Sequence, residues 1–150
     1  MAKLRIDEAD LLGAIEGDEF GAYVLDRQTG EVIRLSEYDE IEEEEEIREL
    51  IDADTSGRFL EVERMQSHDA FRIMSGFVDS LPEGRAAEEL DDALGRNRPF
   101  RRFKDTLHGY PELREQWFAY HEARMREEAL AWLELHEIDA ELVNKYAAED

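Results

Sequence analysis

A period-two pattern of apolar residues occupies positions 22–35. Tyr23 and Leu25 share one face of an extended chain, and the same alternation returns after a short polar segment. Gly30 ends that segment and can adopt the positive φ that a bulged hairpin turn requires. The pattern therefore predicts a β-hairpin. Because two strands alone are only marginally stable in water, residues 58–62 are expected to add a third strand.

Helical patterns lie on both sides of this hairpin. Asp7 is a suitable N-cap for a short helix, with Asp10 three residues later, and Gly17 is a suitable C-terminal end. After the hairpin, residues 37–54 contain eleven acidic residues and a single base, Arg48. We expect a mobile first half of this acidic segment and a helix over its second half, where one face carries Ile47, Leu50 and Ile51.

Apolar residues at helical spacing dominate the rest of the chain. Ser67 is the expected N-cap of a helix that stops at Pro82, and the next helix is expected to begin at Pro82 and to end with Gly95 at its C′ position. The residues expected to face the core in these two helices are Ala70, Phe71, Met74, Phe77, Val78, Leu81, Ala86, Ala87, Leu90, Ala93 and Leu94.

Two more helices are expected before the end of the chain. Asn97 is the predicted N-cap of the first, with Pro99 in its first turn. Pro111 opens a long helix that should reach about Leu135, and a short segment after Asp139 completes the sequence.

These elements predict an α+β fold. A small N-terminal antiparallel β-sheet, made of the hairpin and its third strand, is expected to pack on a mostly α-helical C-terminal half. We expect residues 1–150 to form a single domain, because the hairpin needs a helical layer to cover its apolar face and no Pro-, Gly- or Ser-rich linker interrupts the chain.

Acidic residues outnumber basic ones, 40 against 18, which gives a net charge of −22. A field of that sign opposes approach to DNA, RNA or an anionic membrane, so nonspecific nucleic-acid binding is not expected. The absence of cysteine excludes disulfides, thiol catalysis and thiolate metal sites. No run of about 18 consecutive apolar residues occurs, and the first twenty residues do not resemble a signal peptide, so we expect a cytoplasmic protein.

Several short motifs follow one another along nearly the whole chain: Tyr23-Val24-Leu25-Asp26, Thr29-Gly30-Glu31-Val32, Met74-x-x-Phe77, Gly95-Arg96-x-x-Pro99-Phe100-Arg101-Arg102-Phe103-Lys104-Asp105, Trp117-Phe118 and Trp132-Leu133. Together and in this order they resemble Uncharacterised Protein Family 0158 of bacteria. Asn97-Arg98 precedes Pro99 at a place expected to vary in this family. The resemblance implies bacterial origin and a stand-alone small protein, and it implies no activity, cofactor or catalytic residue.

The main candidate for a binding site is a concentration of positive charge, called here the basic cluster: Arg96, Arg98, Arg101, Arg102 and Lys104. These residues place five of the 18 bases within nine positions that contain no acid. Arginines in the first turn of a helix oppose the helix dipole by about 0.3–1 kcal/mol each, so something should compensate them. One possibility is an external anion, because a guanidinium fork and the backbone N–H groups of a helix start bind phosphate well.

Two other interpretations of the basic cluster stay open. Its arginines could form internal ion pairs with Asp91, Asp92, Asp105 or the Glu42–Glu46 run, since 40 acids are available. Phe100 and Phe103 alternate with the arginines, as in proteins that stack nucleic-acid bases. Both phenylalanines also fit an inward i,i+3 face, and a net charge of −22 disfavours a nucleic-acid target.

A weak calcium-loop pattern lies beyond the acidic segment. Counted from Asp52 as the first position, Asp54, Ser56, Gly57 and Glu63 occupy positions three, five, six and twelve of an EF-hand loop. The neighbouring positions do not fit, because residues 58–62 favour a strand and the preceding acidic run makes a poor entering helix. We therefore expect no bound metal and no cofactor.

No enzyme signature accompanies these features. The sequence lacks a nucleophile elbow, a Walker loop, a dinucleotide fingerprint and a His-Glu-x-x-His zinc motif. The favoured hypothesis is a non-enzymatic interaction module that binds a protein or phosphate-bearing partner through the basic cluster. The alternatives are an acidic mimic of nucleic acid that inhibits a nucleic-acid-binding protein, and a small enzyme with carboxylate chemistry that no motif supports.

Overall fold

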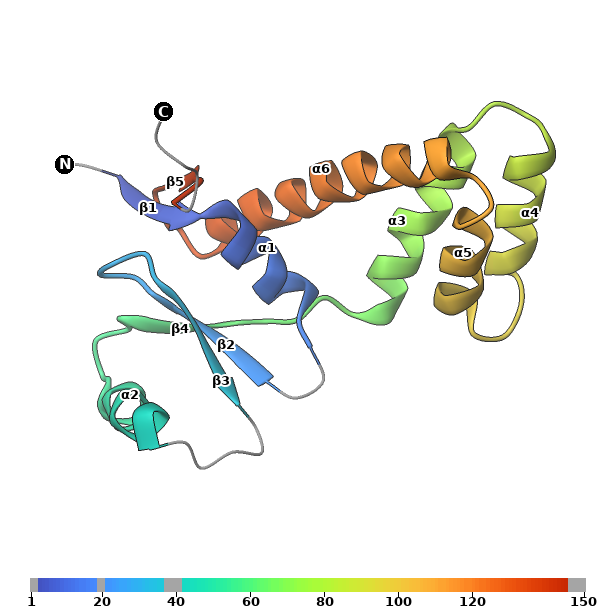
Figure 1. Cartoon of the computed structure of the whole chain (residues 1–150). Coiled ribbons are helices and arrows are strands. Elements are labelled where there is room, and N and C mark those ends of the chain that lie inside the picture. Colours follow the sequence, from blue (N-terminus) through green and yellow to red (C-terminus); the bar gives the residue numbers. More distant parts are fainter. Residues whose placement is uncertain (1–2, 19–20, 37–41, 146–150) are drawn as a thin grey trace. The chain divides into compact units, whose positions relative to one another are not determined.

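The structure is a computed structural model that describes residues 3–18, 21–36 and 42–145. It has the predicted α+β class, with a small antiparallel sheet among the N-terminal strands and a mostly helical C-terminal half (Figure 1). The chain falls into two compact units. Unit 1 comprises Met1–Arg64 and Met125–Asp150, and unit 2 comprises Met65–Arg124. The single domain expected over residues 1–150 stays a prediction.

The predicted hairpin and its third strand are confirmed in unit 1. Three antiparallel strands lie in the order β3–β2–β4, with the bounds Gly21–Asp26 for β2, Val32–Ser36 for β3 and Phe59–Val62 for β4. Val24 on β2 stands opposite Ile33 on one side and Glu61 on the other. Gly30 has φ 84°, and its N–H donates to the Asp26 carbonyl at 2.8 Å, as a turn glycine should.

Two further strands form a separate parallel pair that the sequence patterns did not predict. β1 (Leu4–Asp7) pairs with β5 (Ala140–Val143), and Ile6 stands opposite Leu142. Ile6 is fully buried. The segment expected after Asp139 is therefore a strand, which joins the two ends of unit 1.

The two helices of the N-terminal part were both predicted. α1 (Glu8–Glu16) begins after Asp7, whose side chain accepts a hydrogen bond from the Asp10 N–H at 3.0 Å, and it ends at Gly17 with φ 75°. α2 (Glu42–Ala53) covers the second half of the acidic segment, where a helix was expected, but it begins earlier, within the first half. Residues 37–41 lie outside the described residues, so the mobility expected there stays a prediction.

Unit 2 contains α3 (Ser67–Ser80), α4 (Arg85–Leu94), α5 (Pro99–Leu107) and the first part of α6 (Pro111–Leu135). The bounds predicted for α6 are confirmed. Its core is an aromatic group from three helices. The Phe103 ring lies 5.0 Å from the Trp117 ring and 6.4 Å from the Phe77 ring, and Phe77 lies 5.4 Å from Trp117, all edge-on. Such pairs contribute about 0.5–1.5 kcal/mol each beyond their buried area.

Several predicted details of α3 and α4 are wrong. Ser67 is the first helical residue and not the N-cap, which is Gln66 without a side-chain cap bond. α4 does not begin at Pro82 but three residues later, at Arg85. Phe71 is 36% exposed. Three other residues of the predicted face, Met74, Phe77 and Val78, are buried as expected, and Ile73 is buried without having been predicted.

Gly95 follows α4 as predicted, but it does not serve as a left-handed C′ residue. Its φ is −83° and it lies in the right-handed region, with its N–H shared between the carbonyls of Asp91 and Asp92. α4 therefore tightens at its end, and the following loop leads directly into α5. Figure 1 shows α4 and α5 lying side by side. No helix among the described residues is both long enough and apolar enough to span a membrane.

Candidate anion-binding face

The basic cluster lies on the loop between α4 and α5 and on the first half of α5. The residue that precedes α5 is Arg98, with φ 52° and ψ 53°, followed by Pro99 at the first helical position. The prediction that Asn97 is the N-cap of α5 is therefore wrong, since Arg98 holds that position. A non-glycine residue in the left-handed region costs about 1–2 kcal/mol. The residue before a proline is normally extended, so no local sequence pattern pointed to this conformation.

Asn97 has a different function in this loop. Its side-chain oxygen accepts from Arg102 Nη2 at 3.0 Å, and its backbone carbonyl accepts from Arg102 Nε at 2.8 Å. The guanidinium of Arg102 is thereby fixed against the loop by a neutral residue. These bonds orient the Arg102 charge without neutralising it.

Two arginines of the cluster have acidic neighbours one helical turn away. Arg96 Nε lies 2.9 Å from Asp92 Oδ2, and Arg101 Nε lies 3.9 Å from Asp105 Oδ2. All four side chains are more than half exposed. Exposed pairs of this kind contribute about 0.2–1 kcal/mol or less, so they are readily exchanged for another partner.

The other two cations have no such neighbour. Within residues 3–18, 21–36 and 42–145, neither the Arg98 guanidinium nor the Lys104 ammonium forms an ion pair or a side-chain hydrogen bond. Both residues are exposed. The expected internal pairing thus occurs for Arg96 with Asp92 and, loosely, for Arg101, and it leaves much of the positive charge facing solvent.

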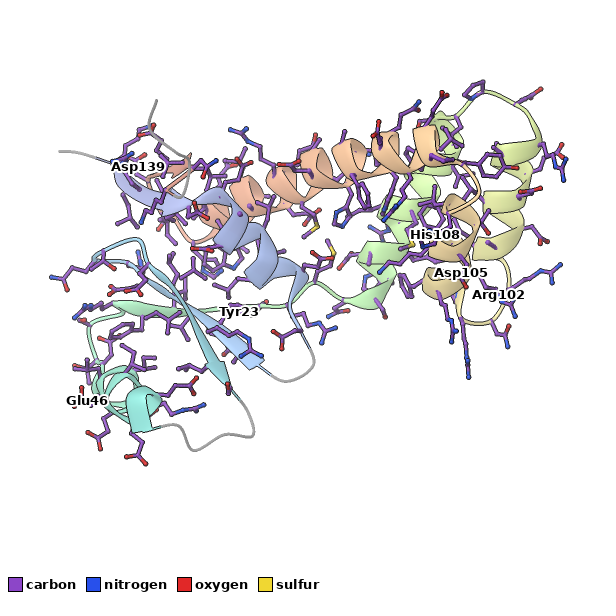
Figure 2. All side chains as sticks on the ribbon, viewed as in Figure 1. Tyr23, Glu46, Arg102, Asp105, His108 and Asp139 are labelled. Carbon is purple, nitrogen blue, oxygen red and sulfur yellow. The ribbon has the colours of Figure 1, made fainter. Side chains whose placement is uncertain are left out.

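Two shallow hollows border the cluster. One, of about 290 Å³, is lined by Arg98, Arg101, Arg102 and Asp105. The other, of about 420 Å³, lies between α4 and α5 and is lined by Glu89, Asp92, Ala93, Arg96, Arg102, Asp105 and Thr106. Nitrogen-tipped side chains project from the part of α5 that carries the labelled Arg102, and Asp105 lies on the same helix (Figure 2). The smaller hollow is the more basic one, with three guanidinium groups and one carboxylate.

The start of α5, which borders the smaller hollow, also carries backbone donors. Pro99 has no N–H, and the Arg102 N–H donates to the Arg98 carbonyl at 3.1 Å. Phe100 and Arg101 therefore supply the first-turn N–H groups that an α-helix leaves without intrahelical partners. The first turn of α5 contains no acidic side chain to satisfy the helix dipole.

The structure separates the two phenylalanines of the segment. Phe103 is fully buried in the aromatic group of unit 2, which confirms the core interpretation for that residue. Phe100 is only partly buried. One such ring does not form the row of exposed aromatic side chains on which successive bases stack.

Two of the calcium-loop residues, Asp54 and Ser56, form hydrogen bonds that shape the turn before β4. Asp54 accepts hydrogen bonds from the Phe59 N–H at 3.0 Å and from the Ser56 N–H and hydroxyl at 3.0 and 2.7 Å. The Phe59 N–H contributes most to a lowered pKa of the Asp54 carboxyl. Asp52 lies on α2 and Glu63 follows β4, and no metal-ligand group of three or more forms in the described part of the chain.

One network near the basic cluster was not predicted. Glu89 on α4 accepts from Arg85 Nε at 2.9 Å and from the Tyr110 hydroxyl at 2.7 Å. The Tyr110 hydrogen bond lowers the pKa of Glu89, and Glu89 in turn raises the pKa of Tyr110. The i,i+4 spacing of Arg85 and Glu89 indicates their pairing, but nothing local indicates Tyr110, which lies 21 residues away.

Comparison with known proteins confirms the resemblance noted in the sequence. A family model described as an uncharacterised protein family (UPF0158) matches residues 4–146. A curated relative, UPF0158 protein PA5073 of Pseudomonas aeruginosa, is 30% identical over 138 residues, which cover 92% of this chain and 87% of the relative. No solved structure gives a significant match.

Proposed function

Because the chain belongs to the uncharacterised family UPF0158, which has no assigned function, we propose one from its own surface. The chain is a non-enzymatic interaction module, and its basic cluster binds a single phosphate group displayed by a partner protein. The phosphate occupies the smaller hollow, between the side chains of Arg98, Arg101 and Arg102.

The observation that carries this proposal is that two arginines of the basic cluster are not neutralised. In a chain with 40 acids and 18 bases, Arg98 and Arg102 have no carboxylate partner among the described residues. Arg98 also holds a left-handed backbone conformation at a cost of about 1–2 kcal/mol. Unneutralised charge and backbone strain together favour a role outside the folded chain, because neither contributes to its stability.

The available donors suit a compact oxyanion. Arg102 uses Nε and Nη2 on Asn97, which leaves Nη1 free to donate and holds the guanidinium in place. Arg98 retains its full set of donors, and the first-turn N–H groups of α5 face the same end of the helix. Arginine forks bind phosphate through charge-assisted hydrogen bonds, which are about twice as strong as neutral ones.

The size and the charge of the site favour a protein partner over a nucleic acid. A hollow of about 290 Å³ is at the small end of ligand sites and accommodates one anionic group. Nucleic-acid binding draws on many phosphate contacts and usually on a basic domain, whereas this chain carries −22. Salt limits the opposing field to about 8 Å at physiological ionic strength, so a single local contact remains possible.

Binding to a degenerate phosphoserine peptide pool tests the proposal, with the unphosphorylated pool as the reference. The double variant Arg101→Glu/Arg102→Glu should abolish phosphate-dependent binding. The control Arg72→Glu/Arg114→Glu makes the same change in net charge on exposed residues of α3 and α6 and should retain it. Equal losses in the two variants, or tighter binding to a single-stranded oligonucleotide than to any peptide, would contradict the proposal.

A further inference from the structure

The acidic helix α2 is not packed into the core of unit 1. In residues 44–53 no side chain is buried, although the helix carries three large aliphatic residues on one face. Ile47 and Ile51 are half-buried, and Leu50 is 54% exposed. Figure 1 shows α2 away from α1 and from the β1–β5 pair. An amphipathic helix normally gains its stability by packing this apolar face, and α2 does so only in part.

Among residues 44–53, most of the charged side chains are carboxylates without a partner. The one base of the helix, Arg48, is held by its own chain, with Nη2 on the Ser36 carbonyl and 3.3 Å from Glu44 Oε2. In the part of α2 whose side chains are described, four carboxylates make neither an ion pair nor a side-chain hydrogen bond: Glu45, Glu46, Glu49 and Asp52. Carboxylate-tipped side chains project from α2, which carries the labelled Glu46 (Figure 2).

This helix is poorly stabilised by its own sequence. At 12 residues it falls within the length at which an isolated helix is marginal in water. Glu45 and Glu49 repel one another at i,i+4, and no basic residue in the last turn offsets the helix dipole. A bound segment that covers the apolar face and neutralises the carboxylates would stabilise α2, because it would bury Leu50 and offset the repulsion between the glutamates.

We infer that α2 is a docking helix for a cationic amphipathic segment of another protein. The complementary segment carries aliphatic or aromatic residues at i, i+3 and i+4 with lysine or arginine on either side. Its apolar residues would cover Ile47, Leu50 and Ile51, and its cations would meet the four free carboxylates. Charge complementarity selects this partner, since an acidic or neutral segment would leave those carboxylates opposed or unpaired.

The apolar face also distinguishes this proposal from nucleic-acid mimicry. A mimic needs carboxylates at the spacing of phosphates and gains nothing from an exposed leucine among them. The proposal is also independent of the basic cluster, which lies in the other unit. The basic cluster of a second copy is a rival occupant, and self-association of the chain would reveal it.

The test uses the intact chain and two synthetic peptides with identical lysine and leucine composition. One peptide places leucines at i, i+3 and i+4, and the other distributes them around the helix. We expect the patterned peptide to bind at least about tenfold more tightly, as measured by fluorescence anisotropy, because only it can bury its leucines on α2. Hydrogen exchange should report slower exchange of the α2 amides when this peptide is bound.

A matched pair of substitutions locates the binding surface. Leu50→Ser should weaken binding of the patterned peptide about tenfold, whereas Leu130→Ser should change it less than twofold. Leu130 is a suitable control, because it is 45% exposed on α6 and also lies among glutamates. Neither leucine is buried, so both variants should fold normally.

Four outcomes would overturn the inference. Equal binding of the two peptides, or equal losses in the two variants, would reduce the attraction to net charge. No binding of the patterned peptide would remove the docking role. Sedimentation of the chain alone as a dimer or larger species, reversed by Leu50→Ser, would make a second copy the occupant in place of another protein.

Discussion

Arg58 holds the buried carboxylate of Asp26 through two hydrogen bonds, from Nε to Oδ1 at 3.0 Å and from Nη2 to Oδ2 at 2.9 Å. The pair joins the end of β2 to the start of β4, where Asp26 also stands opposite Phe59 in the sheet. Asp26 also accepts from the Gln28 N–H at 2.9 Å. One acid thus organises both the hairpin turn and the attachment of the third strand.

This pair predicts a specific acid sensitivity. The hydrogen bond from Arg58 is the largest cause that lowers the pKa of Asp26 from 3.8 to about 2. Because the folded pKa is depressed, the contribution is present above the unfolded pKa and is lost as the pH falls towards 2. It amounts to about 2 kcal/mol. Urea unfolding at pH 7 and at pH 2.5 measures it as the difference between the wild type and Arg58→Ala.

The expected result is a loss of about 2–3 kcal/mol for Arg58→Ala at pH 7 that shrinks markedly at pH 2.5. Arg27→Ala is the control, since among the described residues its guanidinium has one contact, at 3.4 Å with the carbonyl of Gly57, the residue before Arg58. A loss that is the same at both pH values would show that Arg58 acts through packing on Phe59, whose ring centroid lies 4.8 Å from the guanidinium carbon.

Two glycines should respond to alanine in opposite directions. Gly30 has φ 84°, and a Cβ there would collide with the Arg5 carbonyl oxygen, so Gly30→Ala should cost about 1–3 kcal/mol. Gly13 lies within α1 with no atom near its absent Cβ, so Gly13→Ala should stabilise by about 0.5–1 kcal/mol. Thermal unfolding of both variants checks the signs. Equal effects would show that the turn tolerates the added methyl group by shifting away from β1.

Unit 2 should depend on its aromatic group. Phe103 is fully buried, so Phe103→Ala should destabilise by about 3–5 kcal/mol. Phe118 is 53% exposed and contacts Arg114 at 5.3 Å, so Phe118→Ala should cost about 1 kcal/mol or less. Tryptophan fluorescence during urea unfolding reports the change directly, because Trp117 contacts Phe103. Similar losses in both variants would contradict this description of the core.

The elements that the sequence predicted correctly are those specified by local chemistry. Gly30 and the alternation around it predicted the hairpin, and Asp7 with Asp10 predicted the start of α1. The β1–β5 pair was missed because each strand has four residues and pairs with a segment at the opposite end of the chain. No periodic pattern signals a parallel partner at that separation, although Ile6 is fully buried.

The same distinction applies to the candidate site. Composition located the basic cluster, because five bases without an acid are conspicuous in a chain of net charge −22. Composition could not show which arginines are neutralised. Arg96 pairs with Asp92, whereas Arg102 binds neutral Asn97, and both arrangements depend on the loop conformation. The left-handed backbone of Arg98, which sets that conformation, is disfavoured before proline and has no sequence signal.

The double variant Arg101→Glu/Arg102→Glu distinguishes a binding role from a structural one. Both side chains are exposed, and their contacts are a 3.9 Å ion pair and hydrogen bonds to a loop residue. The variant should therefore lose no more than about 1 kcal/mol of stability, measured by thermal unfolding. A loss of several kcal/mol would assign these arginines to the structural support of the α4–α5 loop.

Titration with inorganic phosphate, followed by ¹H–¹⁵N correlation spectra, tests the central claim most directly. Phosphate should shift the backbone amides of Phe100 and Arg101 and the side-chain Nε–H signals of Arg98 and Arg102 in a saturable manner, while equimolar chloride leaves them in place. The Arg101→Glu/Arg102→Glu variant should show no such shifts. Signals at the start of α5 that do not respond to phosphate, or that respond equally to chloride, would contradict the assignment of this face as an anion-binding site.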